Sequence, residues 1–468
     1  MRYIFCLFLT FISIGILSSQ KLVDISIKIN HYDQSKVLFS YYYGGNIYVK
    51  DTLKQTSDGD FKIQRDSLLP RGLYVIYTLP DKQSFEIVIS DDQQFSINTD
   101  FTDIKMSLHT VGSKDNELYI KCLQSIDYRK VEITDLSKKM EYLKGRDDKL
   151  TEQMKSRLIE IADSMRLQQL SIISEYPDLL AKRYILAAKE PQPPKFDLND
   201  KQKLFEIKWR QKNHFFDNID FSDLRHYRSP YVFNQIKFLI GNYFRHPDSL
   251  ESVTKLIISK FSVSGESYQT YFDWLIKYYA LSNQTGFDRG YVYMVKNYIM
   301  KNKTPWIKSI DSLQFVKSAI AFERVLIGNK APDINLPDNK GHILSLYNID
   351  SSYTLVYFGD PDCTHCKEAL PALLEVFDTY NKQGLGIYGV CTRLGTGTEK
   401  CFRYAEANLI KFPIVADGEK VVKVLTDYNL TTYPQYFILD RNKKIVAKNI
   451  NDKELFKVVD YFMKKLKK

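Results

Sequence analysis

The stretch FGDPDCTHCKEALP, residues 358–371, places Cys363 and Cys366 three positions apart. It follows an apolar run typical of a buried strand, YTLVYF (residues 353–358), and leads into a predicted helix. The first turn of a helix offers free N–H groups and the positive end of the helix dipole, which favour a thiolate at Cys363. Cys366 lies one turn further on, where it can resolve a mixed disulfide. The stretch therefore predicts a redox-active pair at a strand-to-helix turn.

A structural disulfide and a zinc site are the alternatives for this pair. Zinc prefers four ligands, and the chain supplies no second Cys-x-x-Cys motif or paired histidine set. Six cysteines in 468 residues are also too few for a disulfide scaffold. The sequence therefore favours redox exchange and predicts no metal.

The residues around the pair predict a compact α/β domain over residues 326–468. Strands and helices alternate there and end in a hairpin and a helix, which is the pattern of such a unit. Further strands are expected at 386–391 and 412–415, and further helices at 401–408 and 419–427.

A different pattern opens the chain. LVDISIKIN (residues 22–30) alternates apolar and polar residues as a half-buried strand does. Similar segments separated by turn signals follow, at 36–43, 47–51, 61–65, 73–78, 85–90 and 94–99. They predict an antiparallel β domain, with the layout of a sandwich, over residues 20–111.

Helical spacing dominates the middle of the chain, residues 112–325. Ser113 can cap the first helix by accepting hydrogen bonds from its free amides. One apolar stripe is formed by Met154, Leu158, Ile161, Met165 and Ile172. Further helices are expected at 231–244, 249–260, 267–280, 288–301 and 309–325. The predicted fold class is thus multidomain: an antiparallel β domain, an all-α middle region and a C-terminal α/β domain.

The first residues, MRYIFCLFLTFISIGILSSQ, combine a positive charge, an apolar run and the small pair Ser18 and Ser19. This pattern predicts a secretory signal peptide over residues 1–19. The apolar run is shorter than the roughly 20 residues of a membrane span, and Cys6 lies too early to accept a lipid at a cleavage site. We therefore expect an exported, periplasmic protein without a transmembrane helix in its mature chain.

The net charge of +10 is modest for 468 residues, and its lysines are scattered apart from the terminal MKKLKK. No pattern of a nucleic-acid-binding module accompanies them. Nucleic acid is therefore not expected as a partner.

Three segments, GNKAPDINL, YFGDPDCTHCKEALP and YNLTTYPQYFILDRNKKIVAK, together resemble the thioredoxin-fold domains of the TlpA-like and ResA-like group. The layout of the whole chain is similar to that of exported proteins of Gram-negative bacteria, in which a β domain and a helical region precede such a domain. The resemblance implies a thiol-disulfide oxidoreductase that acts on protein thiols and disulfides and needs no cofactor.

The resemblance also implies roles for particular residues. Cys363 attacks, Cys366 resolves, and the two form the redox-active disulfide. Pro434 matches the family's cis-proline, whose neighbour Tyr433 presents its backbone to a substrate peptide. A membrane electron donor is a further expected partner if the pair works as a reductant.

The neighbours of the pair leave the direction of electron flow open. The helix dipole, a protonated His365 and the acids Asp360 and Asp362 oppose one another with similar energies of about 0.3–1 kcal/mol each. His365 between the cysteines resembles the motif of protein disulfide isomerase and favours a less reducing centre. Many relatives carry a glutamate where this chain has Ala369, and Glu368, turned by about 100° on the helix, is not expected to replace it.

Two other functions remain as alternatives. A peroxiredoxin-like thiol peroxidase is one, because GNKAPDINL also occurs in such chains, although Asp360 stands where they place a threonine. The other is a ligand-binding or scaffold protein in which the thioredoxin unit is structural.

Other residues that could carry chemistry give weaker signals. Cys391 and Cys401 could form a second disulfide, accept one from the active pair or be buried as apolar residues. Cys122 is expected in a core. HFFDNIDFSDLRH spaces His and Asp by threes from His214 to His226, which does not keep them on one helix face, so a packed loop or a broken helix is favoured over a metal site.

Overall fold

The computed structural model describes residues 22–143, 147–191, 214–243, 249–261, 265–282, 284, 286–430 and 432–466. The predicted signal peptide, with Cys6, lies outside these residues. Contacts divide the chain into two units, which are described separately here. As far as its residues are described, the first is Met1–Phe196 with His214–Gln235, and the second is Asp197–Asn213 with Ile236–Lys468. The helical region predicted at 112–325 contributes to both units.

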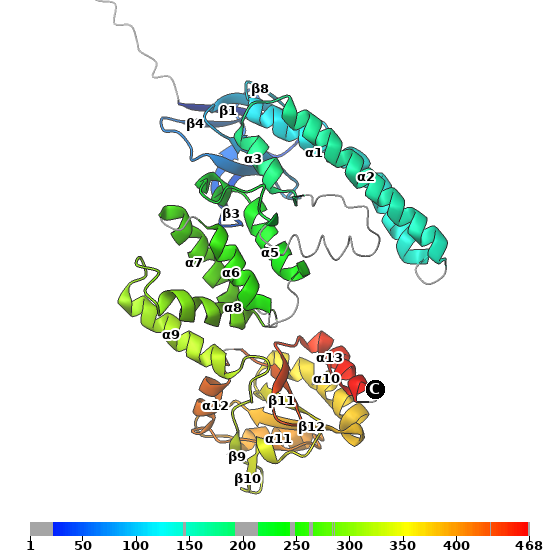
Figure 1. Ribbon diagram of the computed structural model, residues 1–468, viewed down its shortest axis with the longest axis vertical. Helices are drawn as coiled ribbons and strands as arrows, with labels where there is room; N and C mark the ends of the chain where they lie inside the picture. The colour runs from blue at the N-terminus through cyan, green and yellow to red at the C-terminus, as the bar shows by residue number, and fades with distance from the viewer. Residues whose placement is uncertain are drawn as a thin grey trace, which may run out of the picture. The chain divides into compact units, whose positions relative to one another are not determined.

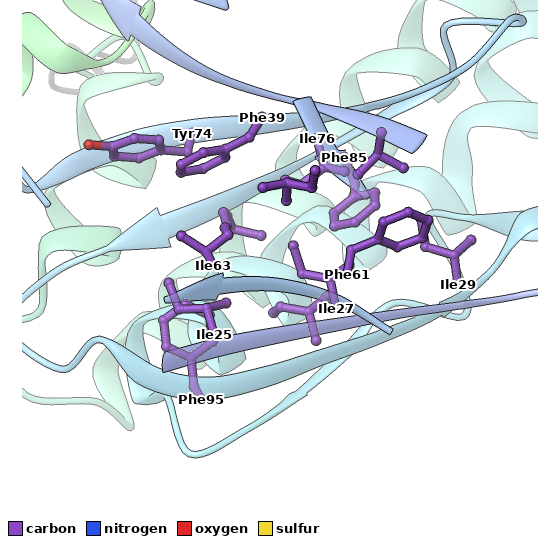
Figure 2. Packing of buried hydrophobic residues seen from close by; sticks show 14 of the residues in the cluster. Ile25, Ile27, Ile29, Phe39, Phe61, Ile63, Tyr74, Ile76, Phe85 and Phe95 are labelled. Carbon is purple, nitrogen blue, oxygen red and sulfur yellow. The ribbon is translucent and has the colours of Figure 1, made fainter. Parts of the chain in front are cut away.

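Two four-stranded sheets form the core of the first unit, in the orders β4-β1-β7-β8 and β3-β2-β5-β6. Side chains from both sheets meet in one apolar cluster, as Figure 2 shows for Ile25, Ile27, Phe39 and Ile76. This is the face-to-face packing of a β-sandwich. The strands are β1 (Val23–Asn30), β2 (Lys36–Tyr43), β3 (Asn46–Lys54), β4 (Phe61–Arg65), β5 (Gly72–Thr78), β6 (Ser84–Ile89), β7 (Gln94–Asp100) and β8 (His109–Val111).

The direction of one strand pair differs from the prediction. Val23, Ile25, Ile27 and Ile29 of β1 are buried, as the alternation predicted. The expectation of an antiparallel domain is wrong for β1 and β7, however, because these strands run parallel. All four strands of the other sheet lie between them in the chain, so no hairpin turn sets their relative direction.

The edges of the two sheets are where the predicted strands depart most from the observed ones. β3 is longer than the predicted 47–51, and β8 was not predicted. Most side chains of β3 are exposed, and β8 has only three residues, so neither offers a long alternating pattern.

Three helices follow the β-sandwich: α1 (Lys114–Leu143), α2 (Asp148–Ser174) and α3 (Leu180–Ala187). α1 and α2 lie side by side as a long helical hairpin (Figure 1). The Ser113 hydroxyl accepts a hydrogen bond from the Asn116 N–H at 3.3 Å, which confirms the predicted cap. Ile161 and Ile172 of the predicted stripe are buried.

α5 (Tyr231–Tyr243) begins in the first unit and continues into the second. The second unit then contains α6 (Leu250–Lys260), α7 (Glu266–Leu281), α8 (Phe287–Met294) and α9 (Ser309–Arg324). A single helix was predicted at 288–301, but the chain widens after α8 into the π-helical segment η5 (Val295–Ile299). Apolar spacing does not distinguish an α turn from such a π turn.

A five-stranded sheet of order β13-β12-β11-β14-β15 forms the rest of the second unit. β11 is central, parallel to β12 and antiparallel to β14. The elements are β9 (Asn335–Pro337), β10 (Ile343–Ser345), β11 (Tyr353–Gly359), α10 (Thr364–Tyr380), β12 (Leu385–Cys391), α11 (Glu399–Ala407), β13 (Ile414–Val415), α12 (Val421–Asp427), β14 (Gln435–Asp440), β15 (Ile445–Lys448) and α13 (Leu455–Lys465).

Helices cover both faces of this sheet. Leu373 of α10 and Val459 of α13 pack with Leu355 on one face. Val421 of α12 packs with Val356 on the other. Buried on both sides, β11 carries the apolar run from which it was predicted, and its end leads directly to the cysteine pair.

Two ion pairs connect the helices α8 and α9 to the α/β part of the second unit. Asp288 of α8 pairs with Lys448 at the end of β15, and both side chains are nearly fully buried. Arg324 of α9 also pairs with Asp427 of α12 at 2.7 Å. These two ion pairs therefore join the α/β part to the helices that precede it.

Candidate active site

Cys363 lies at the turn between β11 and α10, at the N-cap of the helix, as the sequence predicted. Its sulfur accepts a hydrogen bond from the Cys366 N–H at 3.4 Å. The sulfur therefore contacts a free N–H group of the first helical turn, at the positive end of the helix dipole.

The two thiols of the pair have different surroundings. Cys363 is half-buried, whereas Cys366 is 2% exposed. Burial, and then the hydrogen bond with the Cys363 sulfur, raise the pKa of Cys366. Cys363 is therefore the accessible member of the pair, and Cys366 is a protonated thiol behind it at neutral pH.

The Tyr357 side chain of β11 lies beside the Cys366 thiol and interacts with it. Burial raises the pKa of Tyr357, so its hydroxyl stays protonated. A Cβ atom at Gly359 would lie only 2.1 Å from the same hydroxyl. Glycine at position 359 therefore leaves room for the tyrosine that contacts Cys366.

The loop before β14 approaches Cys363. The Tyr433–Pro434 peptide bond is cis, as the family pattern predicted. The Cys363 thiol lies 3.8 Å from the Tyr433 carbonyl oxygen and can donate a weak hydrogen bond to it. The structure thus brings together Cys363, Cys366, Tyr433 and Pro434 from two segments 70 residues apart.

Asp362, directly before Cys363, is paired with two cations. It bonds to Lys400 and, at 2.5 Å, to Arg393, which is also 3.8 Å from Asp360. These hydrogen bonds, first from Lys400 and then from Arg393, lower the pKa of Asp362. The charge balance drawn from the sequence is therefore incomplete, because it omitted both cations.

His365 lies on the solvent side of α10. Its Nδ1 is 3.4 Å from a Glu368 carboxylate oxygen, and the two side chains are 77% and 69% exposed. Ion pairs at such exposure contribute little. Ala369 is buried and Glu368 is not, which confirms that Glu368 does not take the place of the family glutamate.

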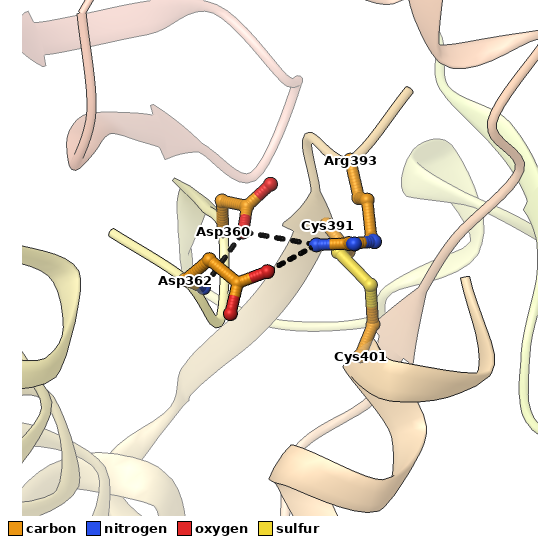
Figure 3. Close-up of a disulfide and its surroundings, with 5 residues drawn as sticks. All are labelled: Asp360, Asp362, Cys391, Arg393 and Cys401. Carbon is orange, nitrogen blue, oxygen red and sulfur yellow. Dashed lines mark hydrogen bonds and ion pairs between the residues drawn. A yellow bond between two sulfur atoms is a disulfide. The ribbon is translucent and has the colours of Figure 1, made fainter. Parts of the chain in front are cut away.

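Cys391 and Cys401 form a disulfide, which the sequence had left open. Figure 3 shows this disulfide beside Arg393, whose guanidinium reaches Asp360 and Asp362. Sequence reasoning did not identify Arg393 or Lys400 as part of the site. The only signal was their position next to Cys391 and Cys401.

Cys122 of α1 is buried in an apolar cluster with Leu118 and Ile172, as predicted. Burial raises its pKa to about 11. This thiol is therefore part of a core.

The segment from His214 to His226 is a chain of turns and a short 3-10 helix, in agreement with the predicted packed loop. His214 pairs with Asp217 at 2.9 Å, and Asp223 with Arg183 at 2.9 Å. Burial lowers the pKa of His226. Within the described residues, no three His, Cys, Asp or Glu side chains are grouped so that they could hold a metal ion.

The sequence model of the AhpC/TSA family matches residues 327–448. The thiol-disulfide oxidoreductase ResA of Geobacillus kaustophilus is 31% identical over 121 residues, which are 26% of this chain and 67% of that protein. Peroxiredoxin Bcp of Escherichia coli is 30% identical over 96 residues, 20% of this chain and 60% of that protein. A solved thioredoxin domain of a thiol-disulfide oxidoreductase from Bacteroides vulgatus is 29% identical and covers 29% of this chain and 97% of its own, with a TM-score of 0.28.

Proposed function

This chain belongs to the ResA-like family of thioredoxin-fold thiol-disulfide oxidoreductases, and we propose that Cys363 and Cys366 carry out its exchange reaction with protein substrates. The main support is the asymmetry of the pair. Cys363 is accessible at a helix N-terminus, while Cys366 is buried with a raised pKa. This arrangement suits an attacking thiol and a resolving thiol.

The exchange proceeds in two displacements. The Cys363 thiolate attacks one sulfur of a substrate disulfide, and the other substrate sulfur leaves as a thiolate and takes up a proton. Cys366, once deprotonated, attacks the Cys363 sulfur and releases the second substrate thiol. Two electrons pass to the substrate, the Cys363–Cys366 disulfide forms, and the reverse sequence oxidises a substrate dithiol.

We assign substrate positioning to the backbone of Tyr433 and to Pro434. The support is the 3.8 Å distance between the Tyr433 carbonyl oxygen and the Cys363 sulfur. A peptide hydrogen-bonded to this backbone as an added strand would hold its own disulfide within reach of Cys363.

Insulin reduction in the presence of dithiothreitol tests the proposed activity. The wild-type chain should accelerate the reduction, and Cys363→Ser should abolish the acceleration. Cys122→Ser, which changes a thiol in a core of the other unit, is the matched control and should retain it. Equal rates for wild type and Cys363→Ser would remove the basis of the proposal.

A thiol peroxidase is the second candidate, supported by the AhpC/TSA match and by the similarity to Bcp. Such an enzyme reduces hydrogen peroxide and passes through a sulfenic acid. Dimedone trapping with Cys366→Ser in hydrogen peroxide distinguishes the two functions. Rapid labelling of Cys363, with no acceleration of insulin reduction by wild type, would favour the peroxidase.

Export is a separate part of the proposal, supported by the signal-peptide pattern of residues 1–19. Among the described residues, no helix is long and apolar enough to cross a membrane. Mass spectrometry of the protein isolated from its native cells should find an N-terminus near residue 20. Finding the intact first residues would contradict cleavage.

A further inference from the structure

The Cys391–Cys401 disulfide joins two elements beside the active-site turn. Cys391 is the last residue of β12 and is the strand partner of Gly359 on β11. Cys401 lies near the start of α11. Both cysteines are buried, with 5% and 3% exposure. The disulfide therefore closes the loop of residues 392–400 directly next to the turn that leads to Cys363.

Both cations that contact Asp362 belong to this closed loop. Arg393 follows Cys391 by two residues, and Lys400 directly precedes Cys401. Each bonds to Asp362 across 31 and 38 residues of sequence respectively. The two side chains that neutralise Asp362 are thus attached just inside the two ends of the loop that the disulfide closes.

We propose that the Cys391–Cys401 disulfide is a positioning element of the redox centre, which holds Arg393 and Lys400 against Asp362 and offsets the negative charge beside Cys363. This inference rests on the proposed function of Cys363 and Cys366.

The loop of residues 392–400 depends on the disulfide to hold its shape, because its glycines allow the backbone many conformations. Gly395 and Gly397 both have positive φ, at 69° and 93°. Within the described backbone bonds, Gly395 donates to the Gly418 carbonyl at 3.0 Å, and Lys400 donates to the Gly397 carbonyl at 3.1 Å. Opening the disulfide lengthens the free loop and lets the two cations leave Asp362.

The sign of the effect follows from the charge on sulfur. The reduced pair carries negative charge on Cys363 when its thiolate forms, whereas the disulfide carries none. The ionised Asp362 disfavours this charge, and the two cations compensate for it. Losing the cations therefore makes the reduced form less stable and the pair more reducing.

The test is the equilibrium of the full chain with reduced and oxidised glutathione at pH 7. After acid quenching, peptide mapping measures the fraction of Cys363–Cys366 disulfide. Two variants remove the effect independently: Cys391→Ser with Cys401→Ser opens the loop, and Arg393→Gln with Lys400→Gln removes both charges.

Each of these two variants should shift the equilibrium constant towards the disulfide form by about threefold or more, which corresponds to about 14 mV. Asp362→Asn should shift it in the opposite direction. Lys411→Gln is the matched control, because Lys411 is an exposed cation of the same unit, 4.0 Å from Asp378, and its loss should leave the constant unchanged.

The same experiment distinguishes a failure of the proposed redox activity from a failure of the positioning role of the Cys391–Cys401 disulfide. A wild-type pair that does not equilibrate with glutathione would overturn the proposed function. If wild type equilibrates but the charge variant behaves as Lys411→Gln does, the inference fails. It also fails if the charge variant shifts and the cysteine variant does not. Should the serine variant lose its circular dichroism signal, Cys391→Val with Cys401→Ala replaces it with apolar side chains at the buried positions.

Discussion

Cys363 and Cys366 lie one helical turn apart, yet they differ in their exposure, in their hydrogen bonds and in the side chains that contact them. Cys363 is half-buried at the N-cap, and Cys366 is enclosed by α10 and by Tyr357. The proposed mechanism depends on which of the two sulfurs reacts first with a substrate disulfide. That order is open to direct measurement.

Iodoacetamide should alkylate Cys363 at least about ten times faster than Cys366 in the reduced protein at pH 7. The raised pKa keeps Cys366 a neutral thiol at that pH, and only the thiolate reacts. The ratio should fall as the pH rises, because Cys366 then ionises. Mass spectrometry of tryptic peptides gives both rates, and equal rates at pH 7 would refute the assignment of roles.

Gly359→Ala should destabilise the protein by about 1–3 kcal/mol, because the new Cβ would overlap the Tyr357 hydroxyl. Urea unfolding measures the free energy of unfolding. Gly241→Ala is the control, since nothing lies within 4 Å of its Cβ position in α5 and alanine is the better helix former there. A neutral effect at position 359 would mean that Tyr357 can move freely.

The sequence predicted the residues of the proposed centre that stand in local motifs, but not the residues that the fold brings beside them. Cys363, Cys366 and Pro434 stand in recognisable segments. Arg393 and Lys400 bond to Asp362 from positions 31 and 38 residues away in the sequence, and no local pattern encodes such a contact. The direction of electron flow was left open because the helix dipole, His365 and the two acids oppose one another with similar energies.

At the scale of elements, buried strands and amphipathic helices were predicted well. β11 follows the predicted bounds within one residue and α10 begins at the cysteine pair as predicted, because an apolar run and a helical spacing mark them. The parallel pairing of β1 and β7, the π-helical η5 and the short β8 depend on long-range packing instead. Periodicity alone does not contain that information.

Asp288→Asn should destabilise the second unit by about 3–5 kcal/mol, because it breaks the buried ion pair with Lys448 of β15. Chemical denaturation of the full chain measures the loss. Asp378→Asn is the same substitution at an exposed pair with Lys411 and should cost no more than about 1 kcal/mol. Similar losses for both variants would show that the buried α8–β15 ion pair contributes no more to the free energy of unfolding than an exposed pair does.

At the scale of the whole molecule, the chain has a separate apolar core in each of its two units. The sequence placed domain boundaries where the pattern of residues changes, at 111 and 325. Contacts group the helices differently, because α1 to α3 pack with the β-sandwich while α6 to α9 belong with the thioredoxin-like part. The apolar spacing of a helix predicts which of its faces is buried, but it does not predict which element packs against that face.

Calorimetry of the full chain should show two unfolding transitions, one for each core. Ile27→Ala, which removes a fully buried side chain at a cost of about 2–5 kcal/mol, should lower the temperature of one transition. Asp288→Asn should lower that of the other. A single transition that both variants shift equally would show that the two units unfold as one.

Trapping the mixed disulfide shows whether Cys363 attacks a substrate disulfide and Cys366 resolves the intermediate. Reduced Cys366→Ser protein is incubated with oxidised glutathione, quenched with acid and mapped by mass spectrometry. We expect one stable glutathione adduct on Cys363 of this variant, and none on that residue in wild type once exchange is complete. Adducts confined to other cysteines, or none at all, would contradict these roles.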